Sequence, residues 1–111
     1  MFYELRQYQL TSTPMIGHMH DRMQNHILPL FERHDIQVAG AWEKVIGGGM
    51  PSYVWMIRWR DLAHREKAFA SFYADERWWE VRRLTTERAG GEMVKNIDVS
   101  ILQPAPYSPL R

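Results

Sequence analysis

Four segments of the chain carry the alternating or β-branched and aromatic patterns that are typical of strands. They cover residues 2–10, 36–46, 53–60 and 93–102. The third segment is the clearest, and its large apolar side chains share one parity: Tyr53, Trp55, Ile57 and Trp59. The turn sequence Gly47-Gly48-Gly49 lies between the second and third segments. Because this connection is too short for a parallel crossover, it predicts a hairpin.

Helical periodicity fills the two remaining intervals. After a cap-like stretch that ends at Pro14, apolar residues recur at three- and four-residue steps along one helical face: Ile16, Met19, Met23, Ile27, Leu30 and Phe31. Pro29 lies near the end of this helix, and we expect a kink or a loosened last turn there. The second interval predicts a broken helix in which Asp61 and Asp75 cap the two halves and Gly90 marks the end.

The resulting order is strand, helix, strand, strand, broken helix, strand. This order predicts an α+β fold, a ferredoxin-like βαββαβ domain with an antiparallel sheet and both helices on one face. We expect one domain over residues 1–111, in which the proline-rich residues 103–111 form an extended tail.

Helices on one face leave the other face of the sheet uncovered. We expect the apolar parity of the third and fourth strands to face the helices: Tyr53, Trp55, Ile57, Trp59, Ile97, Val99 and Ile101. The uncovered face would then carry the other parity together with three residues of the first strand: Val54, Met56, Arg58, Asn96, Asp98, Ser100, Leu102, Glu4, Arg6 and Tyr8. This mixture of apolar and charge-balanced side chains suits a homodimer in which two sheets enclose a semi-polar cavity. The alternative is that the charges pair only to specify a dimer interface, with no ligand.

Landmarks along nearly the whole chain resemble the NIPSNAP family. They are Phe2-Tyr3-Glu4-Leu5-Arg6, His26-Ile27-Leu28-Pro29, Val38-Ala39-Gly40-Ala41-Trp42, Val54-Trp55-Met56-Ile57-Arg58-Trp59, Leu62-Ala63-His64-Arg65-Glu66, Trp78-Trp79 and Tyr107-Ser108-Pro109-Leu110. The resemblance implies a dimeric α/β barrel and is closest to the single-copy bacterial form. The wider fold group includes cofactor-free monooxygenases, haem-degrading oxygenases and isomerases. The family implies no catalytic set, so no catalytic residue is transferred to this chain.

Six residues are candidates for ligand binding: Arg6, Tyr8, His26, Trp42, Arg58 and Asp98. An aromatic wall, one titratable base and a cation for an enolate or carboxylate are the parts needed for proton abstraction or O₂ chemistry on an electron-rich ring. We therefore expect binding of a small hydrophobic or aromatic metabolite, with a cofactor-independent monooxygenase or isomerase as the reaction class. The alternative function is a non-catalytic homodimeric interaction module. On that interpretation Trp42 packs against the sheet and His26 caps the kink.

The other histidines and tryptophans favour structural roles. His18 and His20 would lie about 200° apart on a helix, so they cannot chelate one ion. We expect no metal site and no cofactor, His34 at a helix C-terminus, and an exposed His64. The neighbours Trp78 and Trp79 lie about 100° apart on a helix, so one packs and the other is exposed.

Composition narrows the function classes further. The chain has 14 Lys plus Arg against 13 Asp plus Glu, a formal charge of +1, which gives no basic footprint for nucleic acid. It has no cysteine, which excludes disulfides and thiolate metal sites. The apolar runs are far shorter than the roughly 20 residues of a membrane span, and the N-terminus does not resemble an export signal. We therefore expect a cytoplasmic protein.

Overall fold

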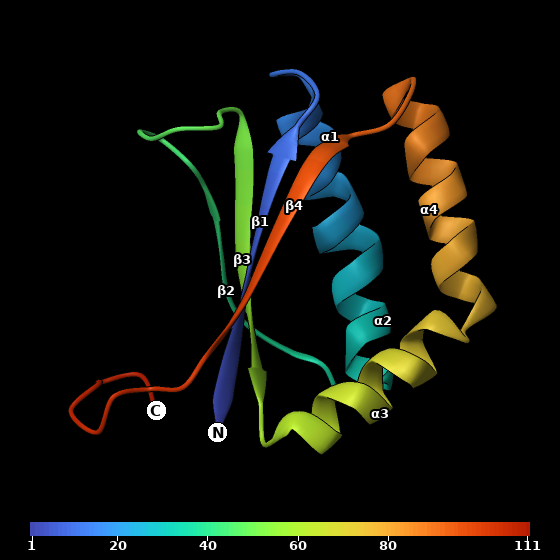
Figure 1. Ribbon diagram of the computed structural model, residues 1–111. Helices are drawn as coiled ribbons and strands as arrows, with labels where there is room; N and C mark the ends of the chain where they lie inside the picture. Colours follow the sequence, from blue (N-terminus) through green and yellow to red (C-terminus); the bar gives the residue numbers. More distant parts are fainter.

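In the computed structural model, which describes residues 1–111, one antiparallel sheet is covered on a single face by helices (Figure 1). The strands are β1 (Phe2–Leu10), β2 (Gln37–Glu43), β3 (Ser52–Trp59) and β4 (Val94–Leu102), and they lie side by side in the order β2-β3-β1-β4. The predicted ferredoxin-like α+β fold is confirmed. The irregular tail at 103–111 lies on the side of the sheet away from the helices.

The first helical interval is one continuous run with a widened middle. It consists of α1 (Met15–Asp21), the π-helical segment η1 (Arg22–Ile27) and α2 (Leu28–Arg33). At the end of η1 the N–H of Leu28 donates to the carbonyl of Met23, five residues back. Pro29 has no N–H for the carbonyl four residues before it, and its ring crowds that carbonyl. The irregularity expected at Pro29 therefore lies in the turn that precedes it.

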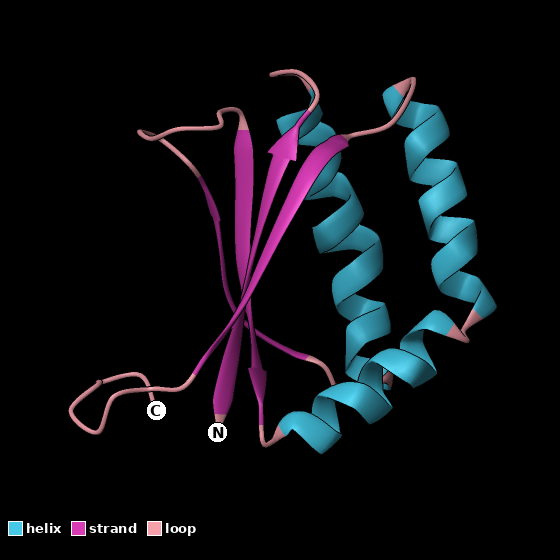
Figure 2. Cartoon of the chain, viewed as in Figure 1, coloured by secondary structure: helices cyan, strands magenta, loops and turns pink.

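The second interval forms α3 (Leu62–Tyr73) and α4 (Glu76–Ala89), which meet at an angle (Figure 2). Asp61 caps α3 by accepting a 2.7 Å hydrogen bond from the N–H of His64. Asp75 caps α4 through the N–H of Arg77 at 2.9 Å. Gly90 ends α4 in the left-handed conformation, with φ of 81°. The predicted caps, the break and the stop are all confirmed.

The register of the sheet places three polar residues of β1 on the face that the helices cover. Arg6 lies directly opposite Trp55 of β3 and Val99 of β4, and directly opposed residues share a face. Glu4 and Tyr8 have the same parity as Arg6 and lie on the same face. The prediction that Glu4, Arg6 and Tyr8 lie on the uncovered face is therefore wrong. These polar side chains are tolerated inside because they bond to one another and to groups from α3 and β3, as described below.

A register shift within β2 changes which of its side chains point toward the helices. Val38 lies opposite Ile57, but Gly40 lies opposite Met56, so Ala39 is the extra residue of a bulge. The regular alternation of β2 ends at this bulge. Trp42 therefore lies on the uncovered face, where its indole covers Gly40: a Cβ at Gly40 would come within 2.6 Å of the ring.

The core fills the space between β3, β1 and the helices. Its fourteen buried residues include the inward parity of β3, as predicted: Tyr53, Trp55, Ile57 and Trp59. The corresponding residues of β4 face the helix side too, but Ile97, Val99 and Ile101 stay 41–47% exposed. The predicted facing is therefore confirmed, but these residues are not buried by the helices, because β4 is an edge strand that the helices do not cover. No helix of the protein combines the length and the apolar character that crossing a membrane requires.

Candidate functional site

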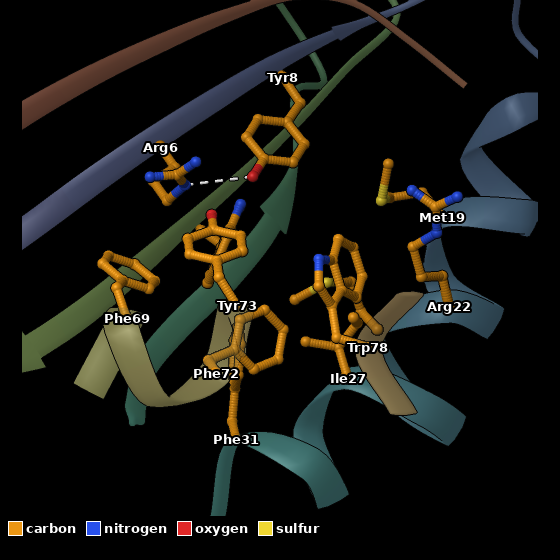
Figure 3. A pocket seen from close by; sticks show the side chains of 12 residues that line it. Arg6, Tyr8, Met19, Arg22, Ile27, Phe31, Phe69, Phe72, Tyr73 and Trp78 are labelled. Carbon is orange, nitrogen blue, oxygen red and sulfur yellow. Dashed lines mark hydrogen bonds between the residues drawn. The ribbon is translucent and has the colours of Figure 1, made fainter. Parts of the chain in front are cut away.

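A cavity lies between the sheet and the helices, with about 440 Å³ of empty space including the part open to solvent (Figure 3). Ten of its twelve lining residues are hydrophobic. Six aromatic side chains from β3, α2, α3 and α4 form much of the wall: Phe31, Trp55, Phe69, Phe72, Tyr73 and Trp78. The first helical run adds Met19, Met23 and Ile27. The wall is therefore apolar on nearly every side.

The aromatic wall is a packed assembly. Phe31 stacks on Trp55 with ring centroids 5.7 Å apart, and it meets Phe72 edge to face at 5.0 Å. Phe72 in turn lies 5.2 Å from Trp78. Offset and edge-to-face contacts of this kind are the favoured arrangements of aromatic rings. They fix the shape of the cavity before any ligand enters.

One end of the cavity is polar. The Nε of Arg6 donates to the hydroxyl of Tyr8 at 3.1 Å, and its guanidinium lies 5.4 Å from the ring centroid of Trp55. The Tyr73 hydroxyl is directed toward Arg6 in Figure 3. A cation and two hydroxyls are thus presented to an otherwise apolar space.

Glu4 lies behind this polar end with no exposed surface. Its carboxylate accepts hydrogen bonds from Arg6 at 2.7 Å, from Arg65 at 2.5 Å and from the indole of Trp59 at 3.0 Å. Burial raises the pKa of the Glu4 carboxyl, but the bonds from Arg65, Arg6 and Trp59 outweigh burial and hold the pKa below its usual range. The single carboxylate therefore faces two guanidinium groups, and one positive charge is left without an acidic partner.

Arg22 is a second cation on the cavity wall. Its guanidinium donates to the hydroxyls of Thr85 at 2.8 Å and Thr86 at 2.9 Å, and it forms no ion pair. The nearby Glu92 pairs with Arg82 instead, at 3.7 Å. Burial lowers the pKa of Arg22, and the positive charge of Arg82 lowers it further. Arg22 is thus a half-buried charge held by neutral groups.

Two indole N–H groups of the wall have no protein acceptor. They are the Nε1 atoms of Trp55 and Trp78, both shielded from solvent. The alternation of β3 predicted that Trp55 faces inward, whereas the sequence left open which of Trp78 and Trp79 packs. Trp78 packs, and Trp79 is exposed. Neither residue was a predicted site residue, because no sequence pattern signals an unpaired donor.

The structure brings together only two of the six candidate residues, Arg6 and Tyr8. His26 does not line this cavity, and its Nε2 lies 3.8 Å from a carboxylate oxygen of Asp21. Trp42 lies on the uncovered face of the sheet, beyond the bulge in β2. The cavity and the predicted constellation are therefore different sets of residues.

Arg58 and Asp98 also lie on the uncovered face, as predicted, but apart from Arg6 and Tyr8. Arg58 donates to the sulfur of Met1 and to the carbonyl of Arg111, both at 3.2 Å. Asp98 is exposed opposite Gln7 of β1. Neither lines the cavity between the sheet and the helices.

Two histidines form hydrogen bonds that link the end of the first helical run to α3 and the residues beside it. The ring of His34 lies between Ser71 of α3, at 2.6 Å from Nδ1, and Asp75, at 2.7 Å from Nε2. His64 accepts from the N–H of Arg60 and donates to the carbonyl of Asp35. Its side chain is only 8% exposed, so the expectation of an exposed His64 is wrong. No three His, Asp or Glu side chains form a group that could hold a metal ion.

Comparisons with known proteins agree with this architecture. The NIPSNAP family model matches residues 3–109. Atu4242 from Agrobacterium tumefaciens is 23% identical with a TM-score of 0.86, covering all of both chains. An uncharacterised NIPSNAP domain protein from Burkholderia xenovorans is 20% identical with a TM-score of 0.82, covering 98% of this chain and 99% of that one.

A more distant solved structure shares the fold. An antibiotic biosynthesis monooxygenase is 14% identical with a TM-score of 0.53, covering 96% of this chain and all of that chain. None of the curated proteins compared with the chain gave a match. At these identities the solved structures show a shared fold, and the function has to be argued from the cavity.

Proposed function

The chain belongs to the NIPSNAP family, and from this premise we propose that it binds a small hydrophobic or aromatic metabolite in the cavity between its sheet and its helices. One observation carries the proposal: an aromatic-walled cavity holds a half-buried cation and hydroxyl, Arg6 and Tyr8, at one end. Ligand sites in proteins typically combine an apolar lining with a few placed polar groups. The monooxygenase with the same fold supports small-molecule chemistry as the general class.

The cavity favours binding over acid–base catalysis. A general base works best when its pKa lies near the operating pH. The lining contains no histidine and no carboxylate, and His26, the expected base, lies outside it. The only neutral acids on the wall are the tyrosines, and burial raises the pKa of Tyr73 further. Cofactor-independent oxygenation and isomerisation both begin by removing a proton from the substrate, so a lining without a base favours binding over either reaction.

The proposal is tested by filling the cavity. Two shape-matched probes, 2-naphthoate and 2-naphthamide, are titrated into the protein while tryptophan fluorescence and Tm are followed. We expect at least one probe to quench Trp55 and Trp78 and to raise Tm. Met23→Phe adds bulk to the wall and should abolish both effects. Met93→Phe, at a buried methionine outside the cavity, is the control and should bind the probe as the unaltered protein does.

Circular dichroism checks that both variants are folded. A chain that binds neither probe, or a Met23→Phe variant that binds them unchanged, would contradict the proposal. Because the first outcome needs no variant, an unfolded Met23→Phe protein does not prevent a decision.

We also propose the second candidate, association of two copies through the uncovered face of the sheet. No helix covers this face (Figure 1), and Trp42 and Leu102 on it are exposed. On the same face, Val54, directly opposite Trp42, and Met56 are half-buried. Light scattering coupled to size exclusion should give twice the 13.2 kDa mass of one chain. Met56→Glu should give the monomer mass, whereas Leu62→Glu, an exposed apolar position on α3, should leave the dimer intact.

A further inference from the structure

We infer that the molecule bound in this cavity carries an oxyanion, such as a carboxylate, attached to its apolar part. This inference rests on the proposed function and specifies the ligand class. It follows from a count of the polar groups that the wall presents. Those groups are hydrogen-bond donors and cations, with almost no acceptor to balance them.

The indole N–H groups are the first part of this imbalance. Trp55 is 4% exposed, and neither its N–H nor that of Trp78 reaches a protein acceptor. In Figure 3 the indole nitrogen of Trp78 lies on the side of the ring that faces Tyr8 and Tyr73. An indole N–H can only donate, so a partner must supply an acceptor. Buried polar groups in native proteins are nearly always paired, so these two donors, both on residues of the cavity wall, call for acceptors that water or a ligand would supply.

The charges on the wall are the second part. Arg6 and Arg22 line the cavity, and the lining contains no acidic residue. Glu4 lies behind Arg6 but is shared with Arg65. Arg22 has only threonine hydroxyls as partners. The two cations in a poorly hydrated space favour an anionic ligand, since electrostatic attraction is strong where water is excluded.

The hydroxyl groups of Tyr8 and Tyr73 do not supply the hydrogen-bond acceptors that the wall lacks. Tyr8 already accepts from Arg6, which leaves its own proton free to be donated. The Tyr73 hydroxyl keeps its proton at neutral pH, because burial raises its pKa. Hydrogen bonds from charged donors to an oxyanion are among the strongest that proteins form. An oxyanion is therefore the ligand group that best complements the donors and cations of this wall.

The same two probes test the inference, because a naphthoate and a naphthamide differ mainly in charge. We expect 2-naphthoate to bind at least roughly tenfold more tightly than 2-naphthamide at pH 7. Arg22→Met should weaken naphthoate binding by roughly tenfold and leave naphthamide binding unchanged. Arg82→Met removes a neighbouring positive charge that does not line the cavity. It should change the binding of either probe by less than about twofold.

Nuclear magnetic resonance gives a second readout that a change in stability would not reproduce. The five tryptophans give five indole N–H signals, and Trp55→Phe and Trp78→Phe identify two of them. Naphthoate should shift these two signals downfield, as expected for new hydrogen bonds, while the Trp79 signal stays in place. Its N–H already donates to the Tyr73 carbonyl at 2.9 Å.

The outcomes separate the inference from the proposed function. Equal or tighter binding of naphthamide overturns the inference and leaves the proposed function intact. The absence of binding by both probes overturns the proposed function itself. Because the comparison of probes uses the unaltered protein, it remains decisive even where a variant does not fold.

Discussion

The carboxylate of Glu4 in β1 accepts a 2.5 Å hydrogen bond from the Nε of Arg65 in α3, across 61 positions of sequence. This pair joins the central part of the sheet to the helix that covers it. Glu4 has no exposed surface, and it also accepts from Arg6 and Trp59. The bond from Arg65 therefore fixes α3 over β1, and the separate bond from Arg6 positions that guanidinium at the polar end of the cavity.

Replacing this carboxylate should be costly. Glu4→Gln leaves Arg6 and Arg65 with no anionic partner, and removing one member of a buried charge cluster typically costs about 3–5 kcal/mol of unfolding free energy. We expect a loss of about 3 kcal/mol, at the low end of this range, because part of the Arg65 side chain reaches solvent and can be hydrated. Urea unfolding measures the change. Glu80→Gln, which breaks an exposed pair with Arg83, is the control and should have a much smaller effect.

The same carboxylate predicts how stability depends on pH. The pKa of Glu4 is lowered below its ordinary value of 4.5 in the folded protein, so the group stabilises the fold above pH 4.5. This stabilisation is lost as the pH falls below 4.5 and through the folded-state pKa. Hydrogen bonds from Arg77 and His34 likewise hold the pKa of Asp75 below 3.8, and its contribution is lost at lower pH.

The check is urea unfolding at several pH values between 7 and 3. The unfolding free energy should decline below about pH 4.5 in the unaltered protein and more gently in Glu4→Gln. Identical slopes in the two proteins would show that Glu4 is not the titrating group.

Two glycines should respond to alanine in opposite directions. Gly17 lies inside α1 with no atom within 4 Å of an added Cβ, so Gly17→Ala should raise the unfolding free energy by about 0.5–1 kcal/mol. Gly90 has φ of 81°, where a Cβ is strained, so Gly90→Ala should lower it by about 1–2 kcal/mol. Thermal unfolding of the two variants beside the unaltered protein tests both. Changes of the same sign would contradict the backbone assignment.

The fluorescence of Trp42 should reveal a substitution at Gly40, the residue of β2 that its indole covers. A Cβ at Gly40 would meet the far edge of the Trp42 indole at 2.6 Å, so Gly40→Ala should push the ring off the sheet. Because the ring is already 50% exposed, we expect a stability loss of no more than about 1 kcal/mol. The fluorescence of Trp42 should shift to the red. The shift should disappear in a Trp42→Phe background, and its persistence there would assign it to another tryptophan.

The fold was predictable from the sequence because its signals are local. Alternation, helical spacing and caps each depend on residues within one element. Asp61 and Asp75 begin their helices, and Gly90 ends the last one, where predicted. The bulge in β2 was not predictable from alternation, because Ala39 fits a regular strand equally well. One extra residue was enough to move Trp42 to the opposite face.

The candidate site was predicted only in part, because its polar members depend on distant partners. In β1 both parities are mixed, so the sequence could not decide which face is buried. Burial of Glu4 and Arg6 becomes favourable only when Arg65 and Trp59 arrive from other elements. The same holds for Arg22, whose threonine partners lie more than sixty residues away. Pairings of this kind are set by the tertiary structure.

The π-helical segment Arg22–Ile27 determines which way the side chains of α2 point around the helix axis. A π turn accommodates one residue more than an α turn, and each residue of a helix advances by about 100°. Deleting one residue from this segment would restore ordinary pitch while keeping α2 in phase with the sheet. The positions of Met23 and Ile27 on the cavity wall would then change without any side-chain substitution. A change of length at this one turn would therefore alter the shape of the cavity while the sheet and α2 stay in place.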